Sequence, residues 1–142
     1  ADRLARSLAG FGEVSVEREA GANAALWRAV RDVEPFHARA GDVWRLSVQP
    51  SKAPELAARL EAGALLYDWG GGLVWALLPE GADARARLGA FSGHATLVRA
   101  SGTTMERLGA LHPEPEPVAR LTEGLLARFD PRGLFSPRRV PA

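Results

Sequence analysis

The order of short apolar patterns between residues 42 and 99 is the feature that most restricts the fold of this chain. Residues 42–49 alternate apolar and polar side chains, which predicts a strand with one face of each kind. A short helix with Pro54 in its first turn is predicted next, then two strands around a glycine run, a helix after Pro79 and a last strand at 94–99. This order predicts an α+β fold, a ferredoxin-like antiparallel sheet with both helices on one face. The other face would be uncovered and would meet solvent, another domain or a ligand.

The segments on either side of this core predict an extension at each end. The N-terminal extension is a strand-helix unit, with alternation at 14–17 and a helix that Glu34-Pro35 ends. Apolar residues at near-helical spacing predict a C-terminal helix before Asp130-Pro131, followed by a tail. We therefore expect residues 1–142 to form a single domain with three parts, an extension at 1–41, a core at 42–100 and the helix and tail at 116–142.

Composition excludes several classes of function. The chain has 142 residues, 46% hydrophobic and 25% charged, which is ordinary for a packed domain. Its net charge of +1 lacks the excess of positive charge that nucleic-acid binding usually requires. The absence of cysteine excludes disulfides, thiolate nucleophiles and cysteine-bound metals. The longest apolar runs are far shorter than the roughly 20 residues of a membrane span. We expect a cytoplasmic chain without a transmembrane segment, and a start without Met inside a helical pattern favours a piece of something longer.

The end of the chain carries a motif. After the last helix it reads Asp-Pro-Arg-Gly-Leu-Phe-Ser-Pro-Arg-Arg. This resembles the closing signature of the vanillyl-alcohol-oxidase-type FAD-linked oxidases, Asp-Pro-x-Gly-x-x-Asn-Pro-Gly-Lys/Arg, whose end approaches the flavin. The resemblance implies cofactor contacts at Ser136, Pro137 and Arg138, although Ser136 replaces the family's Asn and Arg138 its Gly. A helix stop followed by a Gly/Pro turn explains the same residues without a flavin.

Three further segments, at 43–48, 67–75 and 93–99, narrow the resemblance to the FAD-binding subunits of bacterial glycolate oxidase. That resemblance implies a C-terminal cap domain that completes the flavin site of an FAD-dependent 2-hydroxy-acid (glycolate) oxidoreductase. FAD would be bound mainly by an N-terminal domain of the same polypeptide that is absent here, so the isolated fragment would be inactive. The implied partners are a second flavoprotein subunit and an iron–sulfur subunit, through which the protein would be peripheral at the inner membrane.

Arg45 and His94 are the candidate catalytic residues. Arg45 lies on the polar face of its predicted strand, where a guanidinium can hold the carboxylate of a 2-hydroxy acid bidentately, or can form an ordinary ion pair. His94 follows Gly93, where the backbone could approach a ligand closely and an imidazole could take the proton of a hydroxyl. A histidine that caps a turn is the alternative. The other two histidines sit in loops, and their spacing predicts no metal site.

Trp69 and Tyr67 are the candidates for the substrate pocket, beside the glycine run at 70–72, although aromatic residues in strands are most simply core. The glycine run joins two strands and lacks a following helix and Lys-Ser/Thr, so it predicts a hairpin turn and not a phosphate loop. Two other functions stay open. The chain can be a ferredoxin-like module that docks a partner subunit without catalytic residues of its own, or a free-standing regulatory domain that binds a small molecule.

Overall fold

The computed structural model describes residues 1–134. The chain divides into two compact units, Ala1–His37 and Ala38–Ala142. The first unit contains helices α1 (Asp2–Leu8) and α2 (Ala20–Asp32) and the 3-10 turns η1 (Ala9–Phe11) and η2 (Glu34–Phe36).

Helix α2 of the first unit forms where the apolar spacing predicted it. Its N-terminus is capped by the Glu19 carboxylate, which accepts hydrogen bonds from the N–H groups of Gly21 (2.8 Å) and Ala22. The strand predicted at residues 14–17 does not form, and these residues have irregular backbone. Val14 and Val16 are exposed, and within residues 1–134 the segment pairs with no strand. Alternation alone does not make a strand, because a strand needs a neighbour for its backbone N–H and C=O groups.

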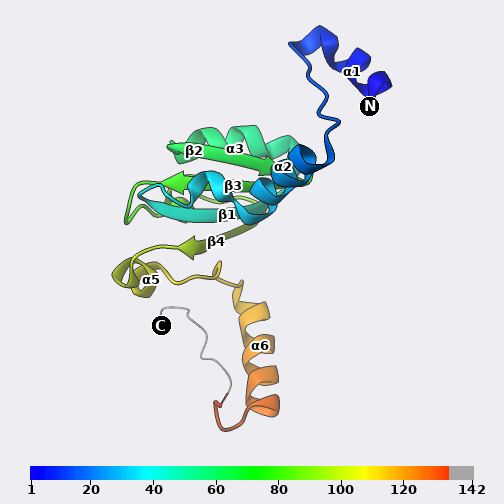
Figure 1. The fold of residues 1–142 in the computed structure, drawn as a ribbon. Helices are drawn as coiled ribbons and strands as arrows, with labels where there is room; N and C mark the ends of the chain where they lie inside the picture. Colours follow the sequence, from blue (N-terminus) through cyan, green and yellow to red (C-terminus); the bar gives the residue numbers. More distant parts are fainter. Residues whose placement is uncertain (135–142) are drawn as a thin grey trace. The chain divides into compact units, whose positions relative to one another are not determined.

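The second unit has the predicted ferredoxin-like core. Its elements follow in the order β1 (Asp42–Val48), α3 (Ala53–Leu60), β2 (Ala64–Asp68), β3 (Leu73–Leu78), α4 (Ala84–Leu88) and β4 (Gly93–Arg99). The strands lie side by side in the order β2-β3-β1-β4, and every neighbouring pair is antiparallel (Figure 1). Short 3-10 turns, η3 (Pro50–Lys52) and η4 (Trp69–Gly71), follow β1 and β2. The α+β, ferredoxin-like fold is confirmed.

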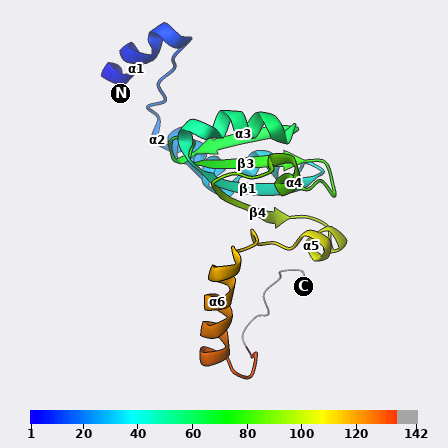
Figure 2. The same ribbon diagram turned by 180° about the vertical axis from the view of Figure 1, so that it is seen from behind.

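Helices α3 and α4 cover the same face of this sheet, as seen from behind in Figure 2. Every second residue of β1 points toward them, and Trp44, Leu46 and Val48 are buried. Leu60 of α3 and Leu88 of α4 are almost completely enclosed against them. Each such side chain contributes about 1.5 to 3 kcal/mol through burial, so this layer supplies the main stabilisation of the unit.

The outer edge of β4 is covered by the segment that follows it. Helix α5 (Gly102–Leu108) turns the chain back, and the Leu97 N–H then donates to the Ala110 carbonyl at 2.8 Å. Helix α5 was not predicted, because its Gly-Thr-Thr start has low helix propensity and no apolar period. Its local signal is Ser101, whose hydroxyl accepts from the Thr104 N–H at 3.3 Å as an N-cap.

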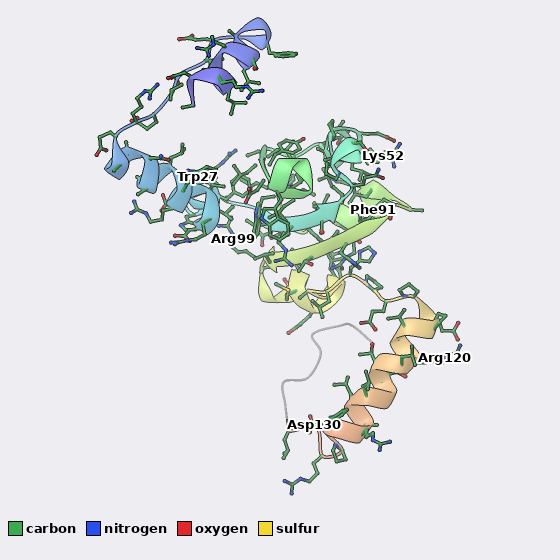
Figure 3. All side chains as sticks on the ribbon, turned by 90° about the vertical axis from the view of Figure 1, so that its right-hand side faces the viewer. Trp27, Lys52, Phe91, Arg99, Arg120 and Asp130 are labelled. Atoms are coloured by element: carbon green, nitrogen blue, oxygen red, sulfur yellow. The ribbon has the colours of Figure 1, made fainter. Side chains whose placement is uncertain are left out.

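Helix α6 (Glu116–Phe129) forms where the apolar spacing predicted it, after the prolines at 113 and 115 and with Pro117 in its first turn. Its side chains stand out along the helix that carries the labelled Arg120 in Figure 3. Leu121, Leu125 and Phe129 are 71%, 58% and 76% exposed, so the apolar side of α6 packs on little of the described chain. No helix within residues 1–134 is both long enough and apolar enough to cross a membrane.

Candidate functional site

The sheet face opposite α3 and α4 brings the two candidate catalytic residues together. Residues directly opposite each other on neighbouring strands point to the same face. Arg45 of β1 is opposite Trp75 of β3 and Thr96 of β4, and Ser47 is opposite His94. His94 is thus a diagonal neighbour of Arg45, a relation that corresponds to about 7 to 8 Å between residues in an antiparallel pair.

This face is only partly uncovered. Val43, Leu73 and Leu77 point to it and are 5%, 7% and 4% exposed. The expectation of a bare face therefore holds for one strip in particular, because these three apolar side chains are buried, whereas Arg45, Ser47 and His94 are exposed. The exposed strip, called the polar strip below, consists of exposed Arg45, Ser47 and His94 with half-buried Trp75 and Thr96.

Arg45 is the one strong cation of the polar strip. Its side chain makes no hydrogen bond or ion pair with any residue among 1–134, and it is exposed. Most arginines of the core already have hydrogen-bond partners. Arg59 donates to Glu55, and Arg85 and Arg99 donate to backbone carbonyls. An uncommitted guanidinium beside the half-buried Trp75 ring can accept a carboxylate in its bidentate fork.

His94 lies at the β4 end of the polar strip and touches a second histidine. Its ring meets the His112 ring edge-to-face, with centroids 5.8 Å apart and an interplanar angle of 81°. His112 comes from the segment after α5, and its Nδ1 accepts the Ala95 N–H at 3.3 Å. Phe91 packs against the same ring at 5.5 Å. His112 was expected to be an isolated loop histidine, and only the return of the chain along β4 brings it to His94.

The protonation state of His112 is biased by this environment. Burial lowers the pKa of His112, and the positive charge of Arg85 and the neighbouring His94 lower this pKa further. An Nδ1 that accepts a backbone N–H also leaves the proton of the neutral ring on Nε2. His112 therefore presents a neutral ring to His94 at neutral pH.

A pH-dependent loss of stability follows from His112. Because the pKa of His112 is lowered in the folded chain, protons bind the unfolded chain better, and stability is lost as pH falls below the ordinary value of 6.5. We expect His112→Asn, whose amide oxygen can still accept the Ala95 N–H, to flatten this dependence. Urea unfolding at pH 8, 7, 6 and 5 measures it. If the free energy of unfolding changed equally between pH 7 and 5 in His112→Asn and in the unmodified protein, His112 would not be the cause of the dependence.

A shallow pocket of about 400 Å³ adjoins His94. It is lined by His94, Leu111, His112, Pro113, Glu114, Ala119 and Glu123. The two histidines and two glutamates do not converge on one point, and no group of three metal-ligating side chains occurs in the described part of the chain.

A second groove, of about 250 Å³, lies beside α3, where Lys52 and Phe91 are labelled in Figure 3. Its cations are already paired. Glu55 binds Lys52 at 3.4 Å and Arg59 at 2.6 Å, and these charges, Lys52 first, lower the pKa of the Glu55 carboxyl. This groove offers an anion no free cation, unlike the polar strip.

The structure does not bring Tyr67 and Trp69 to the polar strip. Tyr67 is opposite Val74, whose side chain is in the core, so Tyr67 points to the helix side of the sheet. Trp69 follows β2 in the left-handed conformation (φ 50°) and is 72% exposed. Because β2 and β4 are the two outer strands, both aromatics lie at the opposite edge from His94.

Gly93 approaches the neighbouring strand closely. A Cβ at Gly93 would lie 2.3 Å from the Ser47 carbonyl oxygen, and its φ of +141° is one that side-chain-bearing residues rarely adopt. Among the described residues, the close approach expected at Gly93 is therefore made to β1. The glycine allows β4 to pair with the end of β1, which puts His94 opposite Ser47.

Comparison with known proteins gives one informative match. No family model and no solved structure matches the chain. Among curated proteins, it is 32% identical to the glycolate oxidase subunit GlcE of Escherichia coli (strain K12) over 142 residues, 99% of the chain. This match confirms the resemblance predicted from the motifs. The chain spans 35% of the length of GlcE.

The glycine run and the N-termini of α4 and α5 do not fit the pyrophosphate of the FAD that the resemblance to GlcE-type subunits implies. The glycines at 70–72 lead into strand β3 and not into a helix. The first N–H groups of α4 and α5 are already bound by the side chains of Asp83 and Ser101. Ser136, Pro137 and Arg138, the expected cofactor contacts, lie outside the described residues.

Proposed function

We propose that this chain is the substrate-side domain of an FAD-linked 2-hydroxy-acid oxidoreductase of the glycolate oxidase type. The observation that carries the proposal is Arg45, an exposed guanidinium without a partner among residues 1–134, on the same sheet face as His94. The similarity to GlcE supports the reaction class. FAD, bound mainly by an N-terminal domain that is absent from this chain, would supply the redox chemistry.

Arg45 would bind and orient the substrate through its carboxylate. A 2-hydroxy acid carries its carboxylate and its hydroxyl on adjacent carbons, so two groups a few ångströms apart must be recognised. Arg45 offers two parallel N–H donors for the carboxylate, a geometry that a lysine cannot provide. Trp75, opposite Arg45, would cover the substrate from one side and exclude water.

His94 would accept the proton of the substrate hydroxyl. Oxidation of a 2-hydroxy acid to a 2-oxo acid removes two electrons and two protons, and one of these protons comes from the hydroxyl. An imidazole is the side chain that most often serves as the base in such a transfer. The neutral His112 ring would hold His94 by its edge contact without adding a positive charge at neutral pH.

Arg45→Met in the intact protein, assembled with its partner subunits, tests the proposal. We expect the KM for glycolate to rise about 10- to 100-fold, the cost of a charge-assisted hydrogen-bonding pair, with the flavin absorbance spectrum unchanged. Steady-state glycolate oxidation at increasing substrate concentration measures the effect. Arg45→Lys should recover only part of the loss.

Two controls make this test specific. Arg120→Met on α6 removes an exposed arginine far along the chain from the sheet and should leave KM unchanged. His94→Gln should lower kcat, with KM less affected. Unaltered kinetics in Arg45→Met would refute the substrate role, and a full rate across the pH range in His94→Gln would remove His94 as the base.

A second function, docking of a partner subunit, is favoured by a different observation. Helix α6 exposes Leu121, Leu125 and Phe129, and large exposed apolar surfaces commonly mark interfaces. Under this function Arg45 would form an ion pair with a partner. Arg45→Met would then weaken assembly of the complex and leave the KM of the assembled enzyme unchanged, which separates the two functions.

A further inference from the structure

The two outer strands of the sheet differ in how their edges are treated. The edge of β4 is satisfied, because Leu97 donates to Ala110 and Ala95 donates to His112. On β2, the backbone bonds within residues 64–68 go to β3 alone among the described residues. An outer strand without a neighbour presents a row of unpaired N–H and C=O groups to any strand that approaches it.

The sequence of β2 lacks the usual protection of an open edge. Proteins commonly prevent such edges from pairing with other chains by means of lysines, prolines or bulges. The sequence of β2, Ala-Leu-Leu-Tyr-Asp, has no lysine or proline and a single charge at its end. Leu65 and Tyr67 are 38% and 44% exposed on one side of the strand, and Trp69 follows at 72%. The edge therefore combines unpaired backbone with exposed apolar side chains.

We propose that the β2 edge pairs with β2 of a second copy of this chain, antiparallel and centred on Leu66, to give a continuous eight-stranded sheet. In this register Leu65 of each copy faces Tyr67 of the other, an aliphatic–aromatic pair that occurs twice. Ala64 faces Asp68 of the second copy, so no like charges oppose each other. A two-fold axis makes the same patch serve both copies, as in most homodimers.

Charge complementarity favours a second copy as the occupant. The guanidinium of Arg39 donates to the Gly63 carbonyl at 3.1 Å, immediately before β2. The Leu66-centred register brings Asp68 of the second copy opposite Ala64 and so next to Gly63. Each Asp68 carboxylate would thus approach the Arg39 of the other copy, twice per dimer. The net charge of +1 adds little repulsion between copies.

A charge-pattern experiment tests this register in the intact protein. Leu65→Lys combined with Tyr67→Lys places two lysines opposite each other at both symmetric positions, and should raise the dimer dissociation constant at least about tenfold. Leu65→Lys combined with Tyr67→Glu places each introduced lysine opposite an introduced glutamate and should remain a dimer. Sedimentation velocity between about 1 and about 100 µM measures the dissociation constant.

Controls separate misfolding from loss of pairing. Leu121→Lys adds a lysine at an exposed apolar site on α6 and should not alter dimerisation. Far-UV circular dichroism should be the same for all variants. In the unmodified protein, amide exchange of residues 64–68 should slow as concentration rises through the dissociation constant.

Three results would overturn the proposal. The first is an unmodified protein that stays monomeric at every concentration measured. This holds also if the amides of β2 exchange slowly in the monomer, because another segment would then cover the edge. The second is a dimer that the double-lysine variant leaves intact. The third is a lysine–glutamate variant as monomeric as the double-lysine variant, since the Leu66-centred register predicts that it pairs.

Discussion

Replacing Arg85 with methionine is expected to lower the free energy of unfolding by about 3 kcal/mol. The guanidinium donates to the carbonyls of Ala95 (3.0 Å), Leu108 (2.7 Å), Gly109 (3.2 Å) and Ala110 (2.9 Å). It also stacks on the buried Trp44 ring at 4.9 Å. Burial lowers the pKa of Arg85, and without the guanidinium its carbonyl acceptors would lose their donor.

Arg85→Lys should restore little of this stability, because an ammonium cannot serve four carbonyls in a planar fork. Urea unfolding monitored by tryptophan fluorescence measures the loss. Arg120→Met, which removes an exposed arginine from α6, is the matched control and should change stability by less than about 0.5 kcal/mol. A loss in Arg85→Met no larger than in this control would show that the hydrogen bonds to the four carbonyls contribute nothing to stability.

Gly93→Ala is the second substitution with a large expected effect. The new methyl group would lie 2.3 Å from the Ser47 carbonyl oxygen, a contact that only backbone movement can relieve, and the φ of +141° adds strain. We expect a loss of about 3 kcal/mol in the free energy of unfolding. Thermal unfolding followed by circular dichroism measures it.

Two other glycines separate the steric cost from the conformational one. Gly89→Ala has open space around its Cβ, so it should cost only the conformational strain of the backbone (φ +65°, ψ −150°), about 2 kcal/mol. Gly102→Ala, at the start of α5 with open space and an ordinary φ, should be neutral or slightly stabilising. Equal losses in Gly93→Ala and Gly89→Ala would mean that β4 moves away from Ser47 at no cost.

The core of the fold was predictable from the sequence because each strand and helix carries its own period. Alternation marked β1, and the spacing of Leu56 and Leu60 marked α3. The failures have a common cause, since the deciding interactions lie outside the segment concerned. Residues 14–17 alternate but find no neighbouring strand, and α5 has no apolar period but receives the Ser101 cap.

The candidate site was predictable only in part. The outward direction of Arg45 follows from the alternation of β1 alone. That His94 lies diagonal to it depends on the adjacency of β1 and β4, which no single strand encodes. His112 and Arg85 were missed, because a loop histidine and a helix arginine have no distinguishing local pattern. Their roles come from the chain running back along β4 after α5.

The contacts of Arg85 have a consequence for sequence variation. All of its hydrogen bonds are accepted by main-chain carbonyls, so the guanidinium recognises the path of residues 108–110 and not their side chains. A substitution at Ala110 can therefore leave these bonds in place, whereas Leu108 also packs against the core and Gly109, at φ +68°, retains a backbone requirement. The position of the segment that delivers His112 to His94 thus depends on Arg85, on the packing of Leu108 and on Gly109, and not on the identity of the side chain at Ala110.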